Sequence, residues 1–179
     1  MTGVENGITD SDFTLTTKLT DDQLRAIGTV VVQWSTLENL VYVAFALFFG
    51  ISMPKGRLIA AHLQRTETLL SIIKQQSDIP AAILHTLDEI ASEIETLNQE
   101  RNQIVHRFWF RQENVADDAL HGFLETRVKE RIPVETTTEA IDELATRIQR
   151  ASAKLTQIMI AYSAAVESAT DSSSKNSSS

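Results

Sequence analysis

The chain contains no cysteine and few of the residues that build tight turns. Among 179 residues there are six glycines and three prolines, well below their ordinary combined share of about 12%. The lack of cysteine excludes a disulfide framework, a thiol nucleophile and zinc sites built on thiolates. Because a many-stranded sheet needs turns that glycine and proline supply, the composition favours a mostly helical protein.

Basic residues are outnumbered, and long apolar runs are missing. With 16 Lys+Arg against 24 Asp+Glu the net charge is -8, which argues against non-specific binding to DNA or to anionic membranes. The longest apolar run, 40–49, is shorter than the roughly 20 residues that a membrane span requires. The polar, acidic start lacks the basic region of a signal peptide. We therefore expect a cytoplasmic protein that does not contact a membrane.

The apolar content of 42% is sufficient for a single core, so we expect one domain. Residues 19–169 are predicted to form it. Residues 1–18 are expected to be a flexible leader, and residues 170–179 a disordered Ser-rich tail with nothing to bury.

Start and stop signals predict four helices in this domain. Apolar residues recur at spacings of three and four, and a capping residue, a proline or a glycine bounds each run. Thr20 with Gln23 and Thr136 with Glu139 form capping boxes, and Gly50 suits the position just after a helix. The predicted helices cover residues 20–50, 54–77, 80–105 and 136–169.

The hydrophobic period changes between the last two helices. Residues 123–128 and 132–134 alternate in the manner of short strands around a turn. The predicted fold is therefore mainly α, a four-helix bundle with a short β-hairpin insertion between the third and fourth helices.

A basic side chain interrupts the apolar face of the predicted third helix. On a helical wheel Arg101 lies between Ile94 and Leu97, in the middle of the apolar stripe. A polar seam beside the stripe consists of Asn98, Asn102 and His106. Because a buried guanidinium costs several kcal/mol unless it is paired, Arg101 needs a partner.

Three explanations of Arg101 stay open from the residues alone. The first is an ion pair inside the bundle with Glu38, which interrupts the apolar part of the first helix. The second is a dimer interface, where a partner chain shares the desolvation of the guanidinium. The third is an anionic ligand or a phosphate transition state, because arginine offers a planar donor fork and histidine titrates near neutral pH.

The sequence Glu100–His106 (ERNQIVH) resembles the signature of the HEPN (higher eukaryote and prokaryote nucleotide-binding) superfamily. That signature is an arginine, a polar residue directly after it, and a histidine four to six residues beyond the arginine. The expected place of the motif, near the end of the third helix of an all-α bundle, is similar as well. Trp34–Glu38 (WSTLE) is similar to an element of uncharacterised bacterial HEPN-like proteins.

The resemblance implies a metal-independent ribonuclease that works as a homodimer, with the two third helices meeting at one cleft. His106 would be the acid and base for the RNA 2′-hydroxyl and the leaving 5′-oxygen. Arg101 would stabilise the phosphate, and Asn102 would bind the imidazole or the phosphate. Such a reaction needs no cofactor and leaves a 2′,3′-cyclic phosphate. A role as a toxin or in phage defence, with a cognate antitoxin protein, rests on the same resemblance.

A second interpretation of the function stays open. Members of this superfamily that have lost catalysis serve as dimeric binding modules, and the motif alone does not separate the two groups. The alternative is therefore a non-catalytic HEPN-like dimer that binds a protein partner or a nucleotide through the same cleft.

Basic and aromatic side chains follow the motif directly. The stretch from Arg101 to Arg111 holds three arginines and one histidine and no carboxylate. Arg107, Trp109 and Arg111 interleave as a platform for single-stranded RNA requires, and together with Asn98 they are the candidate substrate-binding residues. The alternative is that Trp109 closes the end of the bundle and that the arginines are solvated.

No spacing of ligand residues predicts a metal site. His85 with Glu89 is a single pair, and the ligand sets of zinc or di-iron proteins are not present. The first helix, in contrast, is apolar nearly all round at 30–32 and 40–49. We expect part of it to pack against a partner chain, and the alternative is a buried central helix.

Overall fold

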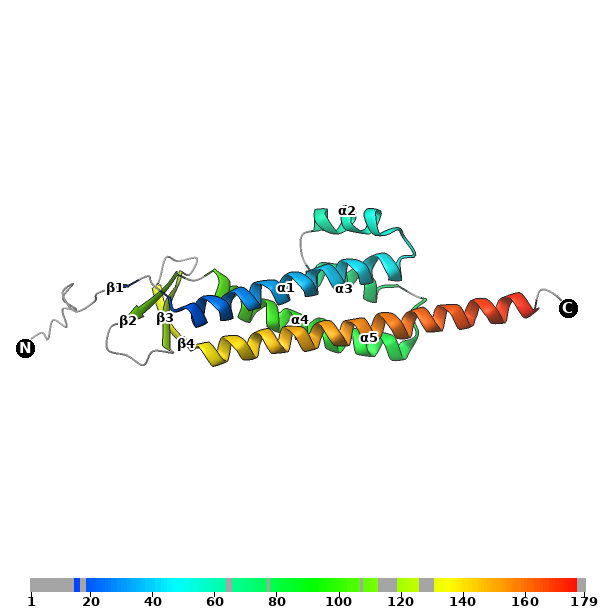
Figure 1. The fold of residues 1–179 in the computed structure, drawn as a ribbon. Helices are drawn as coiled ribbons and strands as arrows, with labels where there is room; N and C mark the ends of the chain where they lie inside the picture. The colour runs from blue at the N-terminus through cyan, green and yellow to red at the C-terminus, as the bar shows by residue number, and fades with distance from the viewer. Residues whose placement is uncertain are drawn as a thin grey trace, which may run out of the picture.

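The protein is mainly helical, as its composition predicts. The computed structural model describes residues 15–16, 19–63, 66–76, 78–106, 108–112, 119–125 and 131–176. Three long helices run alongside one another: α1 (Asp21–Phe48), α4 (Ala81–Val105) and α5 (Thr138–Asn176). The short helices α2 (Met53–Leu63) and α3 (Thr66–Lys74) connect α1 to α4 (Figure 1).

Both ends of α1 are those that the sequence predicts. The Thr20 hydroxyl accepts a hydrogen bond from the Gln23 backbone N–H, and the Thr20 N–H donates to the Gln23 side chain, so the capping box is confirmed. At the other end the backbone of Gly50 has a φ of 59°. Because only glycine adopts this conformation without steric strain, α1 stops there.

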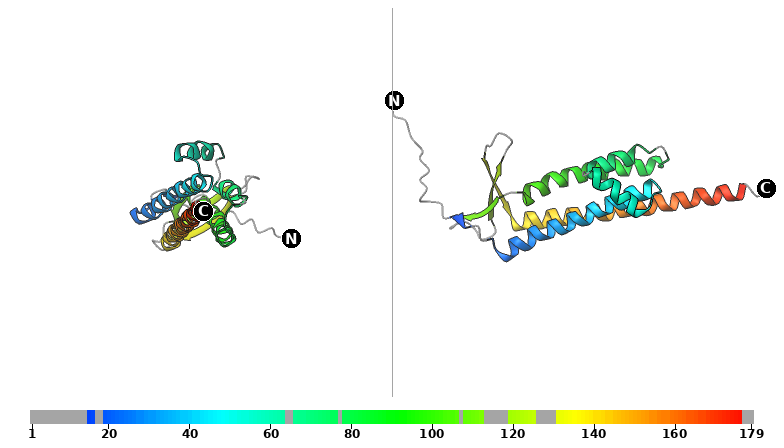
Figure 2. Two further views of the ribbon diagram at one scale, coloured as in Figure 1. Left: turned by 90° about the vertical axis from the view of Figure 1, so that its right-hand side faces the viewer. Right: turned by 90° about the horizontal axis from the view of Figure 1, so that it is seen from above.

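A buried stripe on α1 forms one wall of the core. Trp34, Leu37 and Val41 on this stripe are no more than 1% exposed, and α1 packs along α5 over much of its length (Figure 2). Most residues of 41–48 are also buried. This part of the helix is therefore a buried central helix, which was the alternative to packing against a partner chain. Val31 and Val32 remain exposed, at 37% and 62%.

The length of α1 also revises the expectation about membrane spans. Within the described residues, α1 is long and apolar enough to cross a membrane by length and composition alone. The continuous apolar run 40–49 is only the last part of this helix. The polar residues before it are few enough that the mean hydropathy of the longer helix stays high. The core helix of a soluble protein passes the same test, and α2, α3 and α5 all pack on α1.

The single helix predicted over 54–77 is wrong, since α2 and α3 divide it. The two parts have different neighbours: α2 packs on α1, whereas α3 contacts both α1 and α4. Helix α2 ends at Leu63, and α3 begins at Thr66. In α3 the buried residues Leu69, Leu70 and Ile73 face the core.

The region between α4 and α5 forms a larger sheet than the predicted hairpin over 123–128 and 132–134. Strands β1 (Leu15–Thr16), β2 (Phe108–Gln112), β3 (Ala119–Glu125) and β4 (Arg131–Thr137) form one antiparallel sheet in this order. The aromatic residues of β2 favour an extended strand. The pairing of β1 with β2 also contradicts a flexible leader at these two residues; residues 1–14 and 17–18 lie outside the described chain.

Helix α5 differs from its prediction at both ends. The Thr137 hydroxyl, not that of Thr136, accepts from the Ala140 N–H at 3.2 Å, so the cap lies one residue later. The helix continues to Asn176, beyond the predicted end at Ala169. A helix already formed gains a hydrogen bond with each added residue and needs no new nucleus, so the Ser-rich segment extends it. Residues 177–179 lie outside the described chain.

Gly56 allows α2 to approach α1 closely. Glycine within a helix is usually less stable than alanine, but at this contact an alanine would be the less stable residue. A Cβ added there would lie 2.7 Å from Ala46 Cβ. We expect Gly56→Ala to lower the free energy of unfolding by about 1–3 kcal/mol through overpacking, measured by urea denaturation. Gly28→Ala in α1 is the control, because an added Cβ meets no atom within 4 Å and should stabilise the helix by about 0.5–1 kcal/mol.

The same contact provides a rescue test. If the clash with Ala46 is the cause, Ala46→Gly combined with Gly56→Ala should recover most of the lost stability. A stabilising effect of Gly56→Ala alone would contradict the close approach of α2 to α1.

Candidate functional site

The end of α4 brings together the three residues expected to be catalytic. Nη1 of Arg101 donates a hydrogen bond of 2.8 Å to the Asn102 side-chain oxygen and lies 3.4 Å from Nε2 of His106. His106 is the C-cap of α4, and its N–H donates to the Asn102 carbonyl. Asn102 and His106 are exposed, and Arg101 is half-buried. The motif therefore forms one contiguous group at the sheet end of the helices.

The Arg101–His106 contact specifies the proton on the imidazole. A guanidinium has donors only, so Nε2 of His106 has to accept in this contact. The neutral ring then carries its proton on Nδ1. In this arrangement His106 has the neutral ring that a general base requires, and its Nε2 lone pair is engaged by Nη1 of Arg101 until a substrate displaces that contact.

The guanidinium of Arg101 lies over the indole ring of Trp34 in α1. Its central carbon is 5.7 Å from the ring centroid, within the range of a cation–π interaction. The Nε atom of Arg101 is buried and has no hydrogen-bond partner. Because an unsatisfied buried donor costs about 1–3 kcal/mol, Arg101 is held at some expense to stability.

The predicted ion pair between Arg101 and Glu38 is not found. The contacts of the guanidinium within the described chain are with Asn102, His106 and Trp34. Glu38 lies one helical turn beyond Trp34, and its charge acts instead on Tyr42. Burial, and then the charge of Glu38, raise the pKa of the Tyr42 hydroxyl above its usual value. The residue of α1 that contacts the guanidinium of Arg101 is therefore Trp34 and not Glu38.

The carboxylate next to Arg101 in the sequence is paired elsewhere. Both oxygens of Glu100 accept hydrogen bonds from Arg147 in α5, at 2.6 and 3.0 Å. The hydrogen bond with Glu100 is the main reason that the pKa of Arg147 is raised. This bidentate pair joins α4 to α5 and leaves the charge of Arg101 without a carboxylate partner in the described chain.

Trp109 does not offer a stacking surface to RNA, so this prediction is corrected. The side chain is 8% exposed, and its indole N–H donates a 2.7 Å hydrogen bond to the Ile104 carbonyl. That carbonyl belongs to the last turn of α4, where no backbone N–H is available within the helix. Trp109 therefore closes the end of the bundle, as the alternative interpretation has it, and fixes the point where the chain leaves α4 toward β2.

The remaining candidate substrate-binding residues have a less defined place. Asn98 is half-buried one turn before Asn102. Arg111 lies in β2 opposite Thr16, and the position of its side chain is not described. Arg107 lies outside the described residues. Of the candidates, only Asn98 is shown on the same helix as Arg101 and Asn102.

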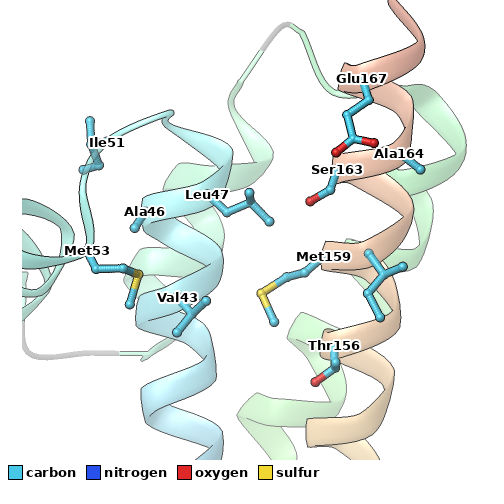
Figure 3. A pocket seen from close by; sticks show the side chains of 11 residues that line it. Val43, Ala46, Leu47, Ile51, Met53, Thr156, Met159, Ser163, Ala164 and Glu167 are labelled. Atoms are coloured by element: carbon cyan, nitrogen blue, oxygen red, sulfur yellow. The ribbon is translucent and has the colours of Figure 1, made fainter.

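Neither a metal-binding group nor the groove beside α1 provides a second candidate site in the described residues. In the part of the chain that the structure describes, no three or more His, Asp or Glu side chains form a group that could hold a metal ion. A groove of about 620 Å³ lies between the end of α1 and α5, lined mainly by apolar residues such as Val43, Leu47 and Met159 (Figure 3). Among the described residues that line it, Glu167 is the one with a charge, so the groove offers a single carboxylate with no cation or second acid–base group beside it.

Substitution of Trp109 tests its role at the end of α4. Trp109→Phe removes the donor to the Ile104 carbonyl but keeps an aromatic ring in the core. We expect the free energy of unfolding to fall by about 1–3 kcal/mol, the penalty for an unsatisfied buried group, measured by urea denaturation. In amide hydrogen exchange the last turn of α4 should open more readily than its middle. Unchanged stability and unchanged exchange in that turn would contradict the assignment.

Comparisons with known proteins assign no family to this chain. No family model matches it, and no curated protein and no solved structure matches it either. Its function is therefore inferred from the side chains gathered at the end of α4 and from the resemblance of their sequence.

Proposed function

We propose that the protein is a metal-independent endoribonuclease of HEPN type, with Arg101 and His106 as its catalytic residues. One observation carries the proposal: Nη1 of Arg101 lies 3.4 Å from Nε2 of His106 at the exposed end of α4. A cation without a carboxylate partner next to an acid–base group suits a phosphodiester, which needs both. Asn102, which binds Arg101 at 2.8 Å, supports the arrangement.

The proposed reaction uses these groups in two roles. His106 accepts the proton of the RNA 2′-hydroxyl as its oxygen attacks the phosphorus, and the bond from phosphorus to the 5′-oxygen breaks. The leaving 5′-oxygen takes a proton from an imidazolium, supplied by the second His106 of a homodimer. Arg101 stabilises the negative charge on the non-bridging oxygens in the transition state. The products are a 2′,3′-cyclic phosphate and a 5′-hydroxyl, and no cofactor takes part.

The finer architecture and context belong to the same proposal. Helices α1, α3, α4 and α5 are the four helices of an HEPN-like bundle, and the strands between α4 and α5 are its insertion. Two chains meet at the ends of α4 so that both motifs face one cleft. Exposed Val31 and Val32 on α1 are additional apolar surface for a partner chain. The protein acts in the cytoplasm as a toxin or phage-defence effector that a cognate antitoxin protein controls.

The rival function, a non-catalytic module that binds a protein or nucleotide, uses the same residues without the proton transfer. The polar contacts of Arg101 on its own helix fit either function, because a bound phosphate and a transferred phosphate need the same cation. An imidazole 3.4 Å from that cation favours the catalytic form, because binding alone does not need an acid–base group.

Substitution of His106 separates the two. We expect the purified protein to cut single-stranded RNA in the presence of EDTA and to leave 2′,3′-cyclic phosphate ends. His106→Ala should lower the cleavage rate by about 10²–10⁴-fold, the usual contribution of a general acid–base residue. The matched control is His85→Ala, since His85 is an exposed histidine of the same helix and pairs only with Glu89.

Each other result of this assay has a definite meaning. If the wild-type protein leaves RNA intact in EDTA at all concentrations, the ribonuclease proposal is wrong and the binding module remains. Equal cutting by wild type and His106→Ala would exclude His106. Light scattering on the same samples should give twice the 19.9 kDa of one chain, and a monomer would contradict the shared cleft.

Substitution of Arg101 tests whether its position serves function and not stability. Arg101→Met removes the buried Nε that has no partner and keeps a long side chain against Trp34. We expect the free energy of unfolding to stay equal or to rise by about 1 kcal/mol, while RNA cleavage falls by about 10²-fold or more. Urea denaturation and initial cleavage rates measure the two effects. A large loss of stability would show instead that Arg101 is a structural residue.

A further inference from the structure

The Trp34 ring contacts the guanidinium of Arg101 in addition to the apolar side chains of the core. Its side chain is 1% exposed, and one face carries the guanidinium of Arg101 at 5.7 Å. The two residues come from different helices, α1 and α4. The ring is therefore placed to hold the arginine from across the helix interface.

The other contacts of Arg101 do not hold its guanidinium from a second element. Asn102 and His106 follow it on the same chain segment and bind only Nη1. The neighbouring Glu100 is paired with Arg147. Within the described residues, Trp34 makes the one ring, hydrogen-bond or ion-pair contact of the guanidinium that comes from another element. Because a free arginine side chain has about 2 kcal/mol of rotamer entropy, Asn102 and His106 alone fix its position weakly.

We propose that Trp34 is a positioning residue for Arg101, and this inference rests on the proposed ribonuclease function. The negative face of the indole attracts the cation and removes water from one side of it. Nε is covered and Nη1 is bound to Asn102, so Nη2 is the donor nitrogen left for a phosphate oxygen. The ring thereby determines which edge of the guanidinium faces the substrate.

The first experiment measures position without RNA cleavage. In a ¹H–¹⁵N spectrum the Nε–H of Arg101, identified by its loss in Arg101→Lys, should be displaced by the ring current of Trp34. We expect Trp34→Leu to return this resonance to the range of exposed arginines, and Trp34→Phe to keep part of the displacement. A resonance that does not move in Trp34→Leu overturns the proposal.

The second experiment measures the reaction. We expect Trp34→Leu to lower kcat/KM for RNA about tenfold, as the loss of a partly desolvated cation–π contact predicts, and Trp34→Phe to recover most of it. The control for lost stability is Leu155→Ala, also a fully buried residue. Its neighbour Lys154 bonds Glu93, two turns of α4 before Arg101, so this variant should lose stability but keep its kcat/KM.

The design separates failure of the inference from failure of the proposed function. If wild-type protein does not cut RNA, the ribonuclease is lost while the spectrum still decides whether Trp34 holds Arg101. Unchanged kcat/KM in Trp34→Leu overturns the positioning role in an active enzyme. If Trp34→Leu does not fold, Trp34 can be replaced by fluorinated tryptophan, which keeps the shape of the ring and weakens its negative face. The parent protein for this labelling is Trp109→Phe, so that Trp34 is the one tryptophan of the chain. A lower kcat/KM with fluorination then supports the proposal, and an unchanged value overturns it.

Discussion

The indole ring of Trp34 lies in the core and at the same time beneath the guanidinium of Arg101. The packing of α1 against the other helices therefore decides where the positive charge of α4 lies. A shift of α1 by one helical turn would bring Glu38 to the level of this contact and exchange a neutral ring for a carboxylate. The charge would then be neutralised within the protein, and no cation would remain for an anionic ligand. The register of α1 and α4 is thus a condition for the site.

The pairing of Glu100 with Arg147 has a similar effect on the other side of α4. Glu100 directly precedes Arg101, and a carboxylate so close would be its natural partner. Its two hydrogen bonds to Arg147 hold it toward α5, so the pair joins two helices and separates two opposite charges. In a chain with a net charge of -8, an arginine without a carboxylate partner needs this kind of arrangement, because carboxylates are abundant. The end of α4 therefore keeps a positive charge that no described carboxylate pairs, in a protein whose net charge is -8.

The elements that the sequence predicts well are those determined by neighbours along the chain. The capping box at Thr20 and the glycine at position 50 act within one or two turns. Arg101, Asn102 and His106 are close together because they lie within six consecutive residues at the end of α4. What depends on contacts between distant segments was missed. The wheel of α4 shows that Arg101 needs a partner, but Glu38 and Trp34 lie on the same face of α1, one turn apart. Only the register between α1 and α4 determines that the partner of Arg101 is the Trp34 ring and not the Glu38 carboxylate.

An arginine with a buried, unpaired Nε is a poor solution for a helix whose only task is packing. Leucine or methionine at this position would join the stripe of Ile94 and Leu97 and leave no donor unsatisfied. A buried polar group without a partner calls for an explanation, and a role in binding or catalysis is one such explanation. The imidazole of His106 lies on the exposed side of the same guanidinium, where such a ligand would enter. The proposed function accounts for both the unfavourable burial of Arg101 and the position of His106, because it places a phosphate at the end of α4.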